Sequence, residues 1–170
     1  MLSSFRLARL QPFWLLLVLT QLVGCGFHLK GYQQPSTALN GLYVMESDLQ
    51  DSVASILRRD LQNGGVAMAS DTETARFSLL VTQEKFSSRV LSVDANGKAL
   101  DNEIRLVVSF RLIPAELDET AAEQQLELVR QLSFSGSDEL GQRNEAALMK
   151  NDMRNDMASQ IIRRLEVQLR

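Results

Sequence analysis

The sequence predicts an α+β fold in which two helices pack on one face of a four-stranded, largely antiparallel sheet. Two segments, 47–63 and 144–169, carry apolar residues at helical spacing. Between them, from 76 to 134, apolar and polar residues alternate, which is typical of strands with one buried face. The chain has 170 residues, 45% of them hydrophobic, which is enough for one core and predicts a single domain.

The first 24 residues have the organisation of a secretory signal peptide. Arg6 and Arg9 precede an apolar run, 13–19, which is far shorter than the roughly 20 residues needed to span a bilayer. We therefore expect residues 1–24 to be removed. The net charge of −3 then becomes −5, because the segment contributes two arginines and no acid. Such an acidic body is not expected to bind nucleic acid.

Cys25 is the single cysteine of the chain and directly follows Leu22-Val23-Gly24. This arrangement resembles the lipobox of bacterial lipoproteins, whose cysteine becomes the first mature residue and receives an N-acyl group and an S-diacylglycerol. Gly26 stands where an aspartate tends to keep such proteins in the inner membrane, so we expect an outer-membrane anchor facing the periplasm. Residues 25–40 would form the lipidated N-terminus and tether, and residues 41–170 one α+β domain.

A short strand and the first helix are expected at the start of the domain. Leu42-Tyr43-Val44-Met45 is a short apolar run with strand character. Ser47 and Gln50 have the spacing of a capping box, and apolar residues follow at helical intervals. We therefore expect a helix that is capped by Ser47 and stopped by Asn63-Gly64-Gly65.

A long hairpin is expected in the middle of the domain. Its first strand is apolar at every second position, but the apolar phase changes between Val81 and Phe86. This change predicts a bulge or bend near 83–85. Asp94-Ala95-Asn96-Gly97 predicts the turn, because an Asn-Gly pair accommodates positive φ. The return strand follows, with an apolar face that extends from residue 100 to residue 112.

The last strand and the last helix complete the expected fold. A loop at 114–120 precedes residues 121–132, which could be helical because their Ala, Glu, Gln and Leu content suits a helix. Their alternation continues through Phe134, so we expect a strand there. The segment 144–169 is expected to be a helix with a core-facing stripe formed by Met149, Met153, Met157, Ile161, Ile162 and Leu165.

The sheet face that the helices leave uncovered is expected to be polar and of mixed charge. Its cations include Lys85, Arg89, Arg105 and Arg111. One interpretation is an ordinary solvent-facing antiparallel sheet. The other interpretation is a surface that binds a polar partner.

No catalytic or metal site is expected. His28 is the only histidine, and no second imidazole or free thiol is present to complete a metal site with it. We expect its ring to form a hydrogen bond where the chain leaves the membrane surface. The sequence contains no Gly-rich phosphate loop, no Gly-x-Ser-x-Gly and no His-Glu-x-x-His. We therefore expect a protein that is not an enzyme and has no cofactor besides the lipid on Cys25.

Two segments of the chain resemble a known family. Cys25-Gly26-Phe27-His28-Leu29-Lys30-Gly31 is similar to the beginning of mature LPS-assembly lipoproteins of the LptE family. The pattern from Leu140 through Asn144-Glu145 to Ile161-Ile162-Arg163-Arg164-Leu165 is similar to the carboxyl-terminal helix of that family. The resemblance implies a non-catalytic outer-membrane lipoprotein that plugs the LPS-assembly barrel, LptD, and assists its assembly and the delivery of lipopolysaccharide.

The same resemblance implies roles for six cations. Lys85, Arg89, Arg105 and Arg111 would face the lumen of the barrel, which is polar in large outer-membrane barrels. Lys98, beside the hairpin turn, and Arg143, in the loop before the last helix, would contribute to lipopolysaccharide binding. The alternative to the barrel-binding function is a lipoprotein that binds another envelope component. The alternative for Lys98 and Arg143 is that they are two solvated loop cations.

Overall fold

The structure is a computed structural model that describes residues 37–45, 52–115, 121–133 and 139–169. The expectations for the signal peptide, for Cys25 and for the motif from Gly26 to Lys30 lie outside the described residues. So do those for most of the tether and for Phe134. The described residues belong to one compact unit, Gln34–Arg170. Among the helices of the described ranges, none is long and apolar enough to cross a membrane.

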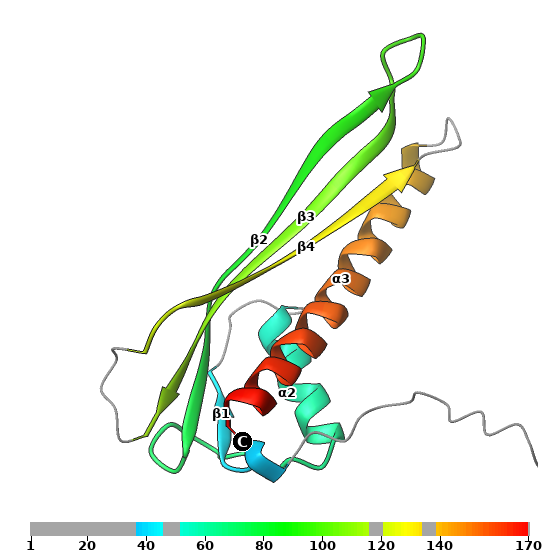
Figure 1. Cartoon of the computed structure of the whole chain (residues 1–170). Helices are drawn as coiled ribbons and strands as arrows, with labels where there is room; N and C mark the ends of the chain where they lie inside the picture. Colours follow the sequence, from blue (N-terminus) through cyan, green and yellow to red (C-terminus); the bar gives the residue numbers. More distant parts are fainter. Residues whose placement is uncertain (1–36, 46–51, 116–120, 134–138, 170) are drawn as a thin grey trace, which may run out of the picture. The chain divides into compact units, whose positions relative to one another are not determined.

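A four-stranded mixed sheet forms one layer of the fold (Figure 1). The strands lie in chain order, with the first pair parallel and the other two pairs antiparallel. The expected α+β class and the mostly antiparallel sheet are therefore confirmed. The strands are β1 (Leu42–Val44), β2 (Phe77–Val93), β3 (Ala99–Pro114) and β4 (Gln124–Ser133).

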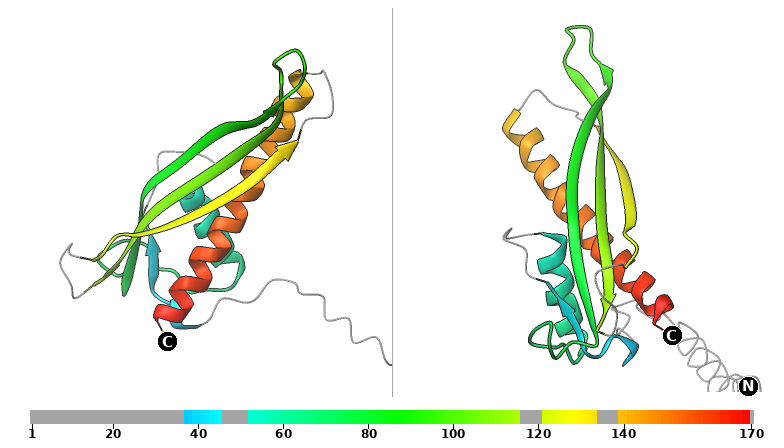
Figure 2. Two further views of the ribbon diagram at one scale, coloured as in Figure 1. Left: turned by 45° about the horizontal axis from the view of Figure 1, so that its top comes forward. Right: turned by 90° about the vertical axis from the view of Figure 1, so that its left-hand side faces the viewer.

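The second layer consists of the helices α2 (Val53–Asn63) and α3 (Glu139–Gln168), and a 3-10 turn, Thr37–Leu39, precedes β1. Helix α3 runs obliquely across the sheet and packs beside α2 (Figure 2). Both helices bury their apolar stripes in the same core as the sheet. The largest fully buried side chains include Leu57, Leu79, Leu106, Phe110, Met153, Met157, Ile161 and Leu165. The expected core stripe of the last helix is confirmed by its buried methionines.

The change of apolar phase in β2 has the expected cause. The pairing register between β2 and β3 shifts between Val81 and Gln83, so Thr82 is the extra residue of a bulge. Because of this shift, Leu79 before the bulge and Phe86 after it both face the helices. The bulge lies one residue before the predicted position.

The turn between β2 and β3 and the identity of β4 also match the expectations. Gly97 has a φ of 79°, and the carboxylate of Asp94 accepts hydrogen bonds from the backbone N–H groups of Asn96 and Lys98. The alternative that residues 121–132 are helical is wrong, because β4 pairs with β3 along its length. Cross-strand hydrogen bonds and the burial of Leu132 outweigh the helix-favouring composition of this segment.

Both helices begin at residues that the sequence did not predict. Helix α2 begins at Val53, and its N-cap is Ser52, whose backbone is extended (φ −82°, ψ 160°) and whose Oγ accepts from Ser55 N at 3.2 Å. The prediction that Ser47 caps this helix is wrong; Ser47 itself lies outside the described residues. Helix α3 begins at Glu139, five residues earlier than expected, so Arg143 lies in the helix and not in a loop.

The packing of the core predicts a large loss of stability on truncation. Leu106 is fully buried on the helix-facing side of β3, whereas Leu148 on α3 is 66% exposed. Urea unfolding of Leu106→Ala should show a free energy of unfolding lower by about 2–5 kcal/mol, because both buried area and packing contacts are lost. Leu148→Ala, as the control, should change it by less than about 0.5 kcal/mol. Equal losses in the two variants would contradict the assigned core.

Candidate functional site

The outer face of the sheet, opposite the helices, is the polar surface predicted from the sequence. Successive side chains of a strand point to opposite faces, and Ile104, Leu106 and Val108 are buried beneath the helices. The side chains of Glu103 and Arg105 therefore point outward. The register with β2 and β4 places Lys85, Arg89, Arg111 and Glu127 on the same outward face. All four predicted barrel-facing cations thus share one surface, although their role in binding stays a prediction.

A row of alternating charges crosses three strands of this outer face. Arg89 on β2 contacts Glu103 on β3 through Nη2 and Oε2 at 3.2 Å. The other carboxylate oxygen of Glu103, Oε1, contacts Arg105 Nη2 at 3.3 Å. Arg105 Nη1 then contacts Glu127 Oε1 on β4 at 2.6 Å. Each acid thus lies beside a base, so the face presents fixed charges of both signs, and we name these four residues the charge row.

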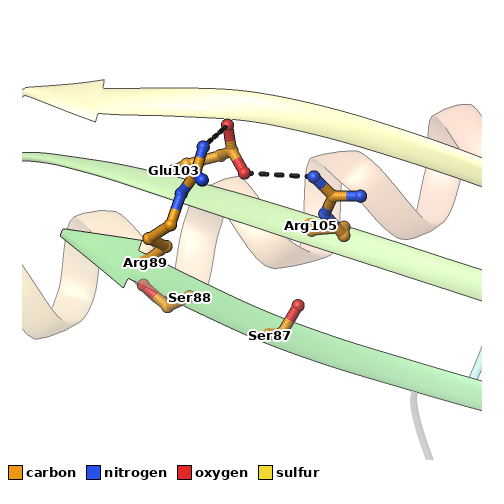
Figure 3. Close-up of a pocket in the computed structure, with 5 residues that line it drawn as sticks. All are labelled: Ser87, Ser88, Arg89, Glu103 and Arg105. Atoms are coloured by element: carbon orange, nitrogen blue, oxygen red, sulfur yellow. Dashed lines mark hydrogen bonds and ion pairs between the residues drawn. The ribbon is translucent and has the colours of Figure 1, made fainter. Parts of the chain in front are cut away.

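A shallow cavity of about 210 Å³ opens beside the charge row (Figure 3). Its lining comes from two adjacent strands: Ser87, Ser88 and Arg89 from β2, and Glu103 and Arg105 from β3. In Figure 3 the Ser87 side chain points toward Arg105, and both guanidinium groups lie beside the Glu103 carboxylate. The cavity therefore combines two cations, one anion and the hydroxyl of Ser87, which suits a polar ligand and not an apolar one.

Asp101, on β3, links three strands through hydrogen bonds at the position where β4 ends. Its carboxylate accepts hydrogen bonds from the Oγ of Ser133 on β4 at 2.6 Å and from the Oγ of Ser92 on β2 at 2.5 Å. The hydroxyl of Ser133, followed by that of Ser92, stabilises the ionised form and lowers the pKa of Asp101 below its ordinary value of 3.8. Beyond this point, within the part of the chain that the structure describes, β2 and β3 continue toward the turn without β4.

The lowered pKa of Asp101 predicts a specific pH dependence. A carboxyl whose pKa is lower in the folded state stabilises the fold above its unfolded pKa, near 3.8. This contribution is lost as the pH falls through the folded pKa. Replacing Asp101 by Asn, or Ser133 by Ala, should therefore lower the urea midpoint at pH 6 more than at pH 3. An equal shift at the two pH values would contradict the hydrogen-bonded carboxylate.

Arg111 lies at the opposite end of the outer face from the hairpin turn. Its Nε is buried and has no hydrogen-bond partner among the residues that the structure describes. The nearest carboxylate oxygen, Glu123 Oε1, is 4.0 Å away and accepts a hydrogen bond of 2.6 Å from Thr82 at the bulge. Arg111 is therefore only loosely paired, in contrast to Arg105.

The two predicted lipopolysaccharide-binding cations lie on different elements. Lys98 ends the turn between β2 and β3, where its backbone N–H donates to Asp94 Oδ1 at 2.9 Å. Arg143 is an exposed residue near the beginning of α3. The hairpin turn and the beginning of α3 lie at the same end of the sheet (Figures 1 and 2). The two elements that carry these cations thus meet at one end of the sheet, and the binding role of the cations stays a prediction.

A buried ionic junction is the main feature that the sequence did not reveal. Glu84, whose side chain is 9% exposed, follows the bulge in β2 and faces the helices. Its Oε2 accepts from the backbone N–H of Val53 at 2.8 Å, at the N-terminus of α2. Its Oε1 accepts from Arg154 Nε of α3 at 2.6 Å. Arg154 also lies over the ring of Phe86, 5.0 Å from its centroid.

The Glu84 junction predicts a large effect on stability. Glu84→Ala leaves Arg154 without its buried partner and removes the acceptor for Val53, so the free energy of unfolding should fall by about 3 kcal/mol. Glu123→Ala is the control, because Glu123 is half exposed and should contribute less than about 1 kcal/mol. Urea denaturation followed by circular dichroism measures both. Equal small losses would show that the junction does not hold the layers together.

No group of three or more potential metal ligands occurs among the described residues. His28 and Cys25 lie outside those residues. The fold and the polar surface define a class of protein: a small α+β domain with two helices on one face of its sheet and paired charges on the other face, which the helices leave uncovered.

Comparisons with known proteins identify the family. The family model LptE, described as lipopolysaccharide-assembly, matches residues 36–165. The LPS-assembly lipoprotein LptE of Yersinia pestis (strain Pestoides F) is 30% identical over 155 residues, which cover 89% of this chain and 73% of the relative. The corresponding protein of Yersinia pseudotuberculosis serotype O:1b shows the same values. The chain therefore belongs to the LptE family of lipopolysaccharide-assembly lipoproteins, which are not enzymes.

Solved structures agree with the fold. An uncharacterized lipoprotein B from Nitrosomonas europaea matches with a TM-score of 0.66 and 25% identity, covering 83% of this chain and 90% of that one. The rare lipoprotein B from Shewanella oneidensis matches with a TM-score of 0.64, 20% identity and coverages of 75% and 94%. The second likeness concerns the fold alone.

Proposed function

We propose that this protein is an outer-membrane lipoprotein, anchored through acyl chains on Cys25, that pairs with the LPS-assembly barrel LptD. The observation that carries this proposal is the family match over residues 36–165. In the proposed organisation, residues 1–24 are removed and residues 25–40, which include Phe27, His28 and Leu29, connect the anchor to the domain. One acyl chain holds a protein only weakly at a membrane, whereas two or three hold it stably.

The outer sheet face supports a role as a plug. The lumen of a large outer-membrane barrel is polar, so a domain that fills it needs a polar surface that is not flexible. The charge row supplies such a surface, because its ion pairs hold long side chains in fixed positions. Lys85, Arg89, Arg105 and Arg111 would face the lumen wall. The protein would thereby assist the assembly of the barrel and the delivery of lipopolysaccharide to the outer leaflet.

Isolation of the complex tests the proposed pairing. The full-length protein, extracted from membranes in mild detergent, should be recovered in a one-to-one complex with a large β-barrel. A variant with a cleavable secretory signal and Cys25→Ala should still form this complex, because the interface belongs to the folded domain and not to the lipid. Recovery of a monomer, or of a complex with a different envelope component, would contradict the proposal.

The proposed lipopolysaccharide contact predicts a charge effect. Guanidinium and ammonium groups bind phosphate through charge-assisted hydrogen bonds, so the double variant Lys98→Glu/Arg143→Glu should retain lipopolysaccharide about tenfold less well in a pull-down. Arg163→Glu, which changes an exposed arginine in the second half of α3, is the control. Equal retention by the parent and the double variant would contradict a role for these two cations.

A further inference from the structure

Some hydrogen-bonding groups of the cavity beside the charge row have partners, and others do not. Within the described residues, Arg89 pairs only through Nη2, and its side chain is 69% exposed. Its Nη1 and Nε therefore remain available to a ligand. The hydroxyl of Ser87, which lies opposite Arg105 on the outer face, makes no hydrogen bond within the same residues.

The carboxylate of the cavity, in contrast, already accepts on both oxygens. One oxygen of Glu103 contacts Arg89 and the other contacts Arg105. The Glu103 side chain is also only 18% exposed, so an incoming group meets the arginines first. Unused guanidinium donors beside an engaged carboxylate favour a group that accepts hydrogen bonds. The cavity therefore selects for an acceptor, and its two guanidinium groups favour one with a negative charge.

The charge balance limits how negative that group is. Two arginines and one glutamate line the cavity, and Glu127, outside the lining, pairs with Arg105, so the charge row as a whole is neutral and Arg89 retains unused donors for one negative charge. A carboxylate supplies one negative charge in a planar shape that matches the two parallel donors of a guanidinium. A phosphate group with two charges would be repelled by Glu103 and by Glu127, which lies on the other side of Arg105. The chemistry therefore favours a carboxylate over a phosphate.

The position of the cavity indicates where the carboxylate comes from. The charge row extends across β2, β3 and β4 with alternating signs, so a partner segment that crosses the strands finds an opposite charge at each step. We propose that this cavity binds the carboxylate of an Asp or Glu side chain from a partner protein, with Arg89 as its main donor and Ser87 beside it. The inference rests on the proposed function, because the partner protein would be the barrel.

Photo-crosslinking in the full complex tests this inference. A photoreactive residue at Gln131, which lies opposite Glu103 in the register, reports on the rim of the cavity. The same residue at Gln125, opposite Ser109, reports on a part of the outer face away from the cavity. Each substitution is combined with Arg89→Glu, with Arg89→Lys and with the control Arg163→Glu. Mass spectrometry of the adducts identifies the crosslinked segment.

The expected result has three parts. The adduct from Gln131 contains a partner segment with an Asp or Glu, and Arg89→Glu lowers its yield about tenfold, as expected for the loss of a charge-assisted contact. Arg89→Lys lowers the yield less, and Arg163→Glu leaves it unchanged. Replacing the identified acid of the partner by Arg restores the yield in the Arg89→Glu background, because the charges of the pair are then exchanged.

Other results would overturn the inference. An adduct between Gln131 and lipopolysaccharide in place of protein would identify a phosphate site. A protein adduct whose yield does not respond to Arg89→Glu would exclude the carboxylate contact. If adducts from Gln125 to the barrel persist in either case, only the inference fails and the proposed function stands. If neither position yields an adduct with the barrel, the proposed function fails together with the inference.

Discussion

The arrangement of the fold depends on one buried carboxylate. Glu84 belongs to β2, yet its two oxygens are used by the two helices, one by the backbone of Val53 and one by the guanidinium of Arg154. Burying a carboxylate costs least when both of its oxygens are hydrogen-bonded. Because one side chain serves three elements, a shift of either helix along the sheet would leave a buried charge without a partner.

Because both helices pack on one face of the sheet, the other face is left uncovered. The apolar stripes of both helices are buried against the sheet, so the opposite face is free to carry charged and polar groups. Its ion pairs are partly exposed and contribute little to stability. Their structural effect lies in orientation, since the Glu103 carboxylate contacts both Arg89 and Arg105. An acidic protein that serves a polyanionic lipid needs such local placement of its cations, because its overall field repels anions.

The periodicity of apolar residues predicted most of the helices and strands. The features that it did not predict depend on contacts between residues far apart in the sequence. The phase change in β2 and the methionine stripe of α3 are visible in the sequence because they follow from burial alone. The start of α2 is not visible in the sequence. Ser47 is locally the better N-cap candidate, and the acceptor that binds the first N–H group of the helix, Glu84, lies 31 residues from Val53. The start of α3 was missed because Gly141 is a poor helix former. Of the polar surface, the sequence predicted the residues, whereas their pairing and the cavity required the strand register.

The most direct test of this account is a double-mutant cycle on the Glu84–Arg154 pair. Glu84→Gln and Arg154→Met, alone and together, are compared by urea unfolding, with the exposed pair Arg59–Asp60 as the reference. The account predicts a coupling energy of about 1.5–3 kcal/mol for the buried pair. For the reference pair it predicts less than about 0.5 kcal/mol. A coupling energy for Glu84–Arg154 as small as that of the reference would show that this ion pair does not hold the helices to the sheet, which is the opposite of what we expect.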